Sequence, residues 1–126
     1  MNVFSLFESA VLAWRDRPAV RHGDRRQTYA ELDAATAAFA AHLASLGLRR
    51  GDRAALFMKN GLGYPAALLG AFRGGYVAVP INAKLHPREL EFILANSGAR
   101  LCFTTAGLHD AVATLCLLYT SPSPRD

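Results

Sequence analysis

Apolar residues recur along this 126-residue chain in two spacings, one helical and one extended. Apolar positions three and four residues apart are typical of helices, whereas short unbroken apolar runs between turn residues are typical of buried strands. These patterns predict helices over residues 4–14, 28–46, 64–72 and 87–96, a hairpin over 19–26, strands over 54–58, 76–81 and 100–104, and a further helix starting over 108–115. Helices and strands therefore alternate along most of the chain.

Capping and turn residues support the predicted helix ends. Thr28 and Glu31 have the spacing of a capping box, in which the hydroxyl accepts from the amide of Glu31 and the carboxylate reaches back. Pro87 fits the first position of a helix, where its missing amide proton is not needed. Gly47 fits the left-handed residue after a helix, and the glycines of Gly70–Gly75 predict close helix packing followed by a C-terminal cap.

The strands between the helices are largely apolar, and Ala54–Met58 is a continuous apolar run. Such runs are typical of strands buried on both faces, which is the usual situation in parallel sheets. A β-α-β-α-β order favours right-handed crossovers between neighbouring strands. We therefore expect an α/β fold: a partial, doubly wound, mostly parallel sheet flanked by helices.

Composition narrows the class of protein. With 52% hydrophobic and 19% charged residues, the chain can bury a core. The net charge is +4, but the basic residues are dispersed and not interleaved with aromatics, so we expect no nucleic-acid partner. The two cysteines form neither a disulfide framework nor a metal-ligand spacing, which favours a reducing compartment.

Targeting signals are not evident in the sequence. The first residues lack the basic region of a signal peptide. The longest uncharged stretch, residues 34–48, is shorter than the roughly 20 residues that cross a bilayer. We therefore expect a cytoplasmic protein without a transmembrane segment.

The last segment, Cys116–Asp126, is rich in serine and proline and shows no structural period. It resembles the in-frame translation of a transposase-end adapter used in preparing sequencing libraries, and a natural serine- and proline-rich linker is the alternative. We therefore expect residues 1–115 to form an incomplete amino-terminal α/β subdomain, and residues 116–126 to be a disordered artefact.

A glycine pattern after the first buried strand has the form of a dinucleotide-binding fingerprint. Gly61, Gly63 and Ala66 match G-x-G-x-x-A between a predicted strand and a predicted helix. Three features weaken the match: Lys59 and Asn60 separate the strand from the first glycine, Asn82 stands where an acid would bind the ribose, and Pro65 removes an amide from the helix terminus. Glycines of a strand-to-helix turn are the simpler interpretation, and a small dinucleotide-binding module is the alternative.

Lys84, His86 and Arg88 lie at the predicted start of a helix, where the helix dipole and positive charge both favour an anion. Solvated loop residues are the simpler interpretation, and an anion-binding site is the alternative. No nucleophile, base and orienting residue occur together. The other chemistry-bearing residues, which we interpret as surface or core residues, are His22, His42, His109 and Cys102.

Seven short motifs follow one another in a fixed order between Leu6 and Thr105. They are Gln27–Leu32, Leu43–Ala55, Asn60, Gly70–Gly75, Val79–Asn82, Glu89-Leu90 and Asn96–Arg100. Their order and spacing resemble the amino-terminal part of AMP-forming acyl-CoA synthetases, within the adenylate-forming ligase superfamily. Peptide-synthetase adenylation domains share much of this region but usually carry Asp-Pro after the strand proline, where this chain has Ile81-Asn82-Ala83. This difference favours an acyl-CoA ligase.

The resemblance implies a two-step ligase. A carboxylate, from a fatty or other organic acid, attacks the α-phosphorus of Mg-ATP to give an acyl-adenylate and pyrophosphate, and the thiol of CoA then displaces AMP. ATP, Mg²⁺ and CoA are the implied cofactors of the parent enzyme. The family's phosphate loop, ribose-binding aspartate and catalytic lysine match no residue here. The chain is therefore expected to be the first subdomain of a larger adenylate-forming domain, with that domain's remainder as its partner.

The resemblance implies one binding residue and no catalytic or metal-binding residue. In some relatives a basic residue just after the Pro-x-Asn turn contacts a phosphate of CoA, and Lys84 has that position. The chain is expected to be inactive alone and to bind no cofactor tightly. The alternatives are the dinucleotide-binding module and a noncatalytic scaffold fragment that pairs through an incomplete sheet edge.

Overall fold

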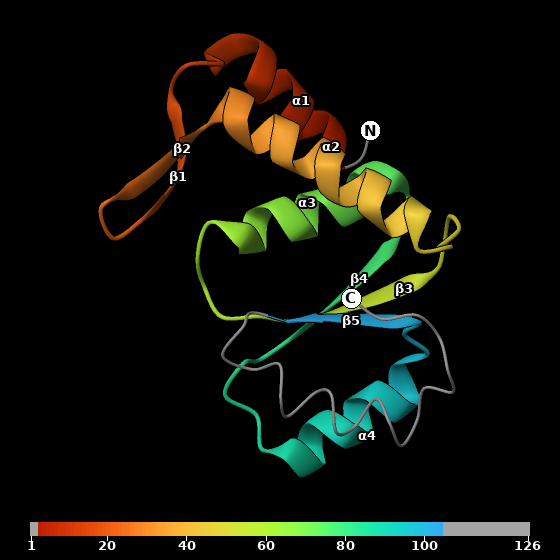
Figure 1. The fold of residues 1–126 in the computed structure, drawn as a ribbon. Helices are drawn as coiled ribbons and strands as arrows, with labels where there is room; N and C mark the ends of the chain where they lie inside the picture. Colours follow the sequence, from red (N-terminus) through yellow and green to blue (C-terminus); the bar gives the residue numbers. More distant parts are fainter. Residues whose placement is uncertain (1–2, 105–126) are drawn as a thin grey trace. The chain divides into compact units, whose positions relative to one another are not determined.

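The computed structural model describes residues 3–104, which form parts of two compact units (Figure 1). One unit comprises the residues up to Arg50 together with Asn60–Tyr76, and the other comprises Gly51–Lys59 together with the residues from Val77 onward. The elements are α1 (Val3–Trp14), β1 (Pro18–His22), β2 (Arg25–Thr28), α2 (Tyr29–Ser45), β3 (Arg53–Phe57), α3 (Gly63–Gly74), β4 (Val77–Ile81), α4 (Pro87–Ser97) and β5 (Leu101–Thr104). Every helix and strand predicted within this range is present, and no end differs from the predicted one by more than two residues.

The first unit contains a two-stranded hairpin and three helices. β1 and β2 pair antiparallel, and the turn between them contains Gly23 at a φ of +62°, in the left-handed region that glycine adopts without strain. The ladder pairs Arg21 with Arg26 and His22 with Arg25. The hairpin therefore brings together, on opposite strands, basic residues that are separated in the sequence.

The capping box at the start of α2 is confirmed. The amide of Glu31 donates to the hydroxyl of Thr28 at 3.1 Å, and the amide of Thr28 donates to the Glu31 carboxylate at 2.8 Å. These two bonds satisfy two backbone donors near the helix terminus. The start of α2 after the hairpin is thus fixed by two residues only three positions apart in the sequence.

Helices α2 and α3 pack closely because α3 has a glycine at the point of contact. A Cβ atom at Gly70 would lie 2.9 Å from the Cβ of Phe39 and 3.0 Å from the carbonyl oxygen of Thr36. Neither atom lies at the flexible end of a side chain. The predicted role of Gly70 in close helix packing is therefore confirmed.

The end of α3 is also as predicted. Gly75 caps the helix at a φ of +79°, in the left-handed region. A side chain at Gly74 would overlap the ring of Tyr76, whose hydroxyl donates to the carbonyl oxygen of Leu48 at 3.5 Å. The two glycines thus have different roles: Gly75 allows the turn, and Gly74 makes room for the tyrosine.

An apolar cluster joins α1 to the start of α2. Its buried members are Phe4, Phe7, Val11 and Leu32. The ring of Tyr29 extends the cluster, with its centroid 6.4 Å from that of Phe7 and 6.1 Å from that of Trp14. Leu6, although part of the helical apolar pattern, is exposed, because it lies on a different side of α1 from the buried residues.

Arg73, near the end of α3, connects the three helices of the first unit. Its guanidinium donates to the carboxylate of Asp33 at 3.0 Å and to the hydroxyl of Thr36 at 3.2 Å, both on α2. The same group lies 5.3 Å from the centroid of the Phe4 ring of α1, a cation–π distance. Thr36 is fully buried, and its hydroxyl also donates to the carbonyl oxygen of Asp33 at 2.7 Å, so burial leaves it satisfied.

The second unit is a three-stranded parallel sheet in the order β4-β3-β5, with α4 linking β4 to β5. Arg53 is in register with Val77 on one side, and Ala54 with Leu101 on the other. The chain thus places the first of the three strands in the centre, then adds a strand on each side, which is the order of a doubly wound sheet. The predicted α/β class with a parallel sheet is confirmed.

The core of the second unit lies between the sheet and α4. Its buried members are Ala55, Phe57, Ile81 and Leu90. Arg53 donates to the carbonyl oxygen of Ser97, at the end of α4, at 2.5 Å. The turn after α4 contains Gly98 at a φ of +72°. The apolar packing and the hydrogen bond from the Arg53 side chain to the backbone of α4 therefore both hold α4 against the sheet.

Some predictions concern residues outside those described, namely the helix over residues 108–115, His109 and the segment 116–126. Among the described helices, none is both long enough and apolar enough to cross a membrane.

Candidate functional site

The connection between β4 and α4 contains the basic residue singled out from the sequence. β4 ends at Ile81, and the side-chain oxygen of Asn82 accepts from the amide of Lys84 at 2.9 Å. The amide of Leu85 donates to the carbonyl oxygen of Asn82 at 3.1 Å. This Asx turn is a local structure that asparagine favours, and it holds the backbone of Lys84 while leaving the side chain exposed.

The start of α4 is capped by His86. Its Nδ1 accepts from the amide of Arg88 at 3.2 Å, and its own amide donates to the carboxylate of Glu89 at 3.4 Å. An imidazole nitrogen that accepts a hydrogen bond carries no proton, so the ring proton of neutral His86 is on Nε2. The sequence contained the signal for this cap, because a polar residue precedes Pro87 and Glu89 lies three positions after that residue. Histidine, however, is not among the usual capping residues.

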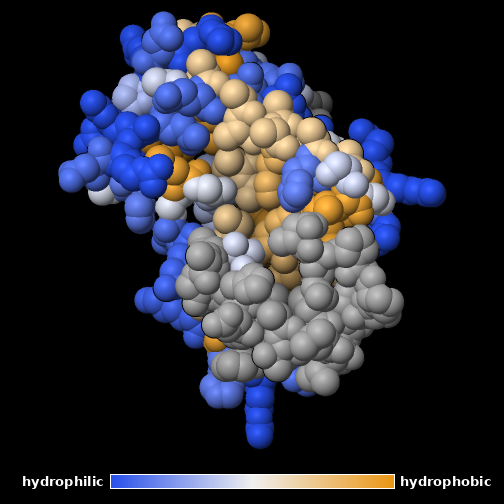
Figure 2. All heavy atoms as spheres, viewed as in Figure 1, coloured by the Kyte–Doolittle hydropathy of each residue, from blue (hydrophilic) through white to orange (hydrophobic). Residues whose placement is uncertain are grey.

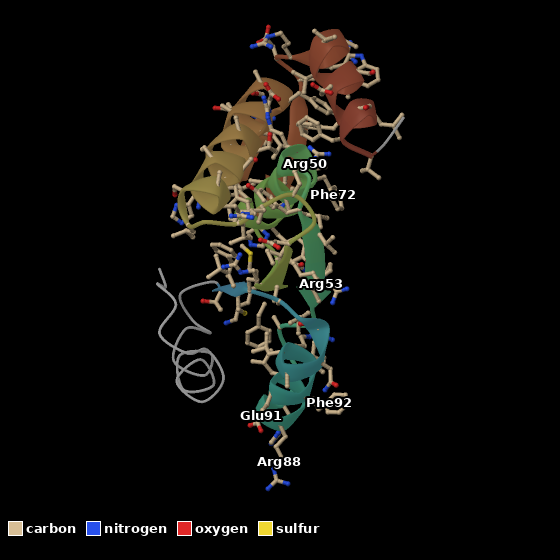
Figure 3. All side chains as sticks on the ribbon, turned by 90° about the vertical axis from the view of Figure 1, so that its right-hand side faces the viewer. Arg50, Arg53, Phe72, Arg88, Glu91 and Phe92 are labelled. Atoms are coloured by element: carbon tan, nitrogen blue, oxygen red, sulfur yellow. The ribbon has the colours of Figure 1, made fainter. Side chains whose placement is uncertain are left out.

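Lys84, His86 and Arg88 thus lie close together along one short segment, and all three are exposed. Figure 3 shows the side chain of Arg88 extending away from α4. Two backbone donors at this helix start are already used by His86 and Glu89, and the Glu89 carboxylate adds a negative charge. An anion here would therefore depend on the charge of the Lys84 ammonium more than on free backbone amides.

The glycines of the apparent dinucleotide fingerprint do not have the geometry of a phosphate-binding loop. Neither Gly61 nor Gly63 is among the glycines with positive φ in the described part of the chain. A Cβ at Gly61 would meet nothing within 4 Å. The backbone here requires no glycine at position 61, and α3 begins at Gly63 without a side-chain cap. The interpretation as a strand-to-helix turn is therefore favoured over a dinucleotide site.

The other residues considered from the sequence do not form a second site. His22 lies on the exposed hairpin and His42 on the exposed side of α2. Cys102 is half-buried in β5 against the apolar core of the second unit. Within residues 3–104 no group of three or more histidine, cysteine, aspartate or glutamate side chains could hold a metal ion.

Comparison with known proteins identifies the family of the chain, which the geometry alone does not give. The sequence profile of the AMP-binding enzyme family matches residues 7–123. A long-chain-fatty-acid–CoA ligase of Yersinia pestis is 43% identical over 99 residues, which cover 78% of this chain and 18% of the relative. Surfactin synthase subunit 2 of Bacillus subtilis is 36% identical over 107 residues, covering 85% of this chain and 3% of that protein.

A solved structure shows the same fold. The N-terminal domain of FACL13 from Mycobacterium tuberculosis superposes with a TM-score of 0.86 at 30% identity, covering 98% of this chain and 32% of that one. The α/β class defined by the parallel sheet is therefore that of the adenylate-forming ligases. The chain belongs to the AMP-binding enzyme family, and the sequence resemblance to AMP-forming acyl-CoA ligases is confirmed. It spans about a fifth of the length of the curated CoA ligase that it matches.

Proposed function

We propose that this chain supplies the first α/β segment of an ATP-dependent carboxylate–CoA ligase that acts through an acyl-adenylate. The observation that carries the proposal is the 43% identity to a long-chain-fatty-acid–CoA ligase over most of this chain. A fatty or other organic acid is the proposed substrate, and the cytoplasm is the proposed location. The match to a surfactin synthase subunit is lower, at 36% identity, so a CoA ligase is preferred to a peptide-synthetase module.

The described residues account for only part of such an enzyme. Residues 3–104 offer no metal-binding cluster, and no glycine-rich segment there is followed by the Lys-Ser/Thr of a phosphate loop. They do not fit Mg²⁺ or the phosphates of ATP, so no chemical step is assigned to them. In this proposal the chain provides a folded framework and a contact with CoA, and it provides no catalytic residue.

The first test concerns activity. We expect the 126-residue chain to release no pyrophosphate from Mg-ATP in response to a fatty acid, because the groups that would stabilise charge on the transferring phosphorus are not among the described residues. Pyrophosphate release is measured with and without palmitate, with a complete acyl-CoA ligase as the positive control. Palmitate-dependent release by this chain would show that it is not inactive alone.

The second test concerns Lys84, which we propose contacts a phosphate of CoA. The support is its exposed position after the Asn82 turn, together with its place in the family motif. Because a single exposed ammonium provides a weak contact, we expect binding at about millimolar concentration. Amide NMR shifts should then appear around Lys84 on addition of CoA.

Matched variants and ligands make this test specific. Lys84→Gln should abolish the shifts, whereas Lys59→Gln, the same change at the other lysine of the chain, should preserve them. Pantetheine, which lacks the phosphates, should produce no shifts in the unaltered protein. Equal responses to CoA and pantetheine, or an unchanged response in Lys84→Gln, would remove Lys84 from the site without affecting the family assignment.

A further inference from the structure

The connection between β3 and α3 contains the only Asn-Gly pair of the chain, Asn60-Gly61. β3 ends at Phe57 and α3 begins at Gly63, so the pair belongs to neither element. In Figure 1 the connection is the loop on the left between β3 and α3, and Figure 2 shows mainly hydrophilic side chains on the left of the same view. Asn60 is exposed, so water reaches its side chain.

The backbone and side-chain contacts of this pair leave it free to rearrange. Within residues 3–104, no hydrogen bond is found from the Asn60 side chain or from the Gly61 amide. A Cβ at Gly61 would meet nothing within 4 Å. Glycine also gives the backbone more conformational freedom than any other residue. The amide nitrogen of Gly61 can therefore approach Cγ of Asn60.

The other asparagines among the described residues are held by hydrogen bonds. The side-chain amide of Asn96 donates to the carbonyl oxygen of Phe92 at 2.8 Å, and the next residue, Ser97, is the last of α4. The side-chain oxygen of Asn82 accepts from the amide of Lys84 at 2.9 Å. Both side chains are thus fixed on partners other than the nitrogen of the following residue.

We propose that the unrestrained Asn60 is a site of spontaneous deamidation and isomerisation, with water as the co-reactant. The Gly61 nitrogen attacks Cγ of Asn60, and a new N–Cγ bond forms as the Cγ–Nδ2 bond breaks. The departing nitrogen takes the proton that the Gly61 amide loses and leaves as ammonia, which closes a cyclic succinimide. Water then opens this ring. Opening at Cγ gives aspartate, and opening at the backbone carbonyl carbon of residue 60 gives isoaspartate.

Both products change the connection in a measurable way. Each adds one carboxylate, which lowers the formal net charge of the chain from +4 to +3. Isoaspartate also lengthens the backbone by one carbon atom, because the chain then runs through the side chain of residue 60. Its carboxylate is the group that isoaspartyl methyltransferases modify, so the altered chain would be a substrate for this class of enzyme.

Peptide mapping by mass spectrometry follows the reaction at each asparagine separately. The 126-residue chain is incubated in heavy-oxygen water at neutral and at mildly alkaline pH, so that ring opening labels the product. We expect Asn60 to lose ammonia at least about tenfold faster than Asn82 or Asn96, because only its Cγ is open to the following nitrogen. The reaction should be faster at the higher pH, since base removes the amide proton of Gly61. An isoaspartyl methyltransferase with labelled methyl donor identifies the isoaspartate.

Two variants separate the effect of the local structure from that of the dipeptide sequence. Gly61→Ala should slow the reaction at Asn60 about tenfold, because a side chain restricts the backbone conformations in which the nitrogen reaches Cγ. Ala83→Gly creates a second Asn-Gly pair, but one whose asparagine is held by the Lys84 amide. In this variant Asn82 should remain slower than Asn60 in the folded chain, and the two rates should converge in concentrated urea. Circular dichroism checks that both variants retain their secondary structure.

Three results would overturn the proposal. One is reaction at Asn60 no faster than at Asn82 and Asn96 in the folded chain, and another is an unchanged rate in Gly61→Ala. The third is equal rates at Asn60 and Asn82 in folded Ala83→Gly, which would show that the structure does not select the site. The outcome does not depend on the proposed ligase activity, since no substrate or cofactor is present.

Discussion

At the scale of single residues, glycines show how local geometry decides between structural and functional interpretations. Gly70 is required because a neighbouring helix leaves no room for a side chain, whereas Gly61 faces open space. The sequence pattern allowed two interpretations of Gly61: the simpler one was a strand-to-helix turn, and the alternative was part of a dinucleotide-binding fingerprint. Its backbone conformation and surroundings do not support that interpretation.

This contrast gives a prediction about stability. Gly70→Ala should lower the free energy of unfolding by about 1–2 kcal/mol, because the strain of overpacking exceeds the gain in helix propensity. Gly61→Ala, the matched control, should change it by less than about 0.5 kcal/mol. Urea unfolding followed by circular dichroism measures both. A Gly70→Ala protein as stable as the Gly61→Ala protein would contradict the close packing of α2 on α3.

Predictions for single residues were confirmed where the residue's conformation depends on its neighbours in the sequence. The capping box of Thr28 and Glu31 and the left-handed Gly47 and Gly75 depend on residues within a few positions along the chain. The cap formed by His86 is equally local, but its residue type is unusual for that role. The sequence placed Lys84 at the β4–α4 connection, while the turn that holds its backbone emerged only from the structure.

At the scale of elements, Arg73 was not predictable as the link between helices. Its partner Asp33 is 40 residues away in sequence, and no local pattern relates the two. The apolar spacing that predicted the helix over residues 28–46 did not mark Thr36 as a core residue, because threonine is polar, yet its side chain is fully buried. The structure shows that this hydroxyl is buried with its hydrogen bonds satisfied.

The Arg73 contacts give a second prediction about stability. Arg73→Gln should destabilise the protein by about 1–2 kcal/mol, because it removes an ion pair, a hydrogen bond to Thr36 and a cation–π contact with Phe4. Arg73→Lys should recover only part of this loss, since lysine lacks the planar fork. Thermal and urea unfolding provide the comparison.

A surface ion pair serves as the control for this change. Arg100→Gln, which breaks the bridge to Asp52, should cost less than about 1 kcal/mol. A double-mutant cycle of Arg73→Gln with Asp33→Asn then isolates the ion pair from the other contacts. If Arg73→Gln cost no more than Arg100→Gln, the role of Arg73 in joining the three helices would be refuted.

At the scale of the whole molecule, hydrophobic patterning predicted the alternation of elements and a parallel sheet. It did not predict the strand order β4-β3-β5, because any of several orders buries the same apolar runs. Nor did it reveal the cationic hairpin, since arginines dispersed in sequence become neighbours only when β1 pairs with β2. The family was inferred from the order and spacing of short motifs, and the family profile confirms it. No single motif, interpreted physically, identified the family.

The central position of β3 has a consequence for biosynthesis. Ribosomes make proteins from the amino terminus, so β3 emerges before both strands that flank it. Its apolar residues from Ala54 to Phe57 are fully or almost fully buried in the folded protein. Until the later strands are synthesised, this segment has no sheet neighbours and is open to aggregation or to capture by chaperones. The strand that organises the finished sheet is thus the one most in need of protection while the chain is being made.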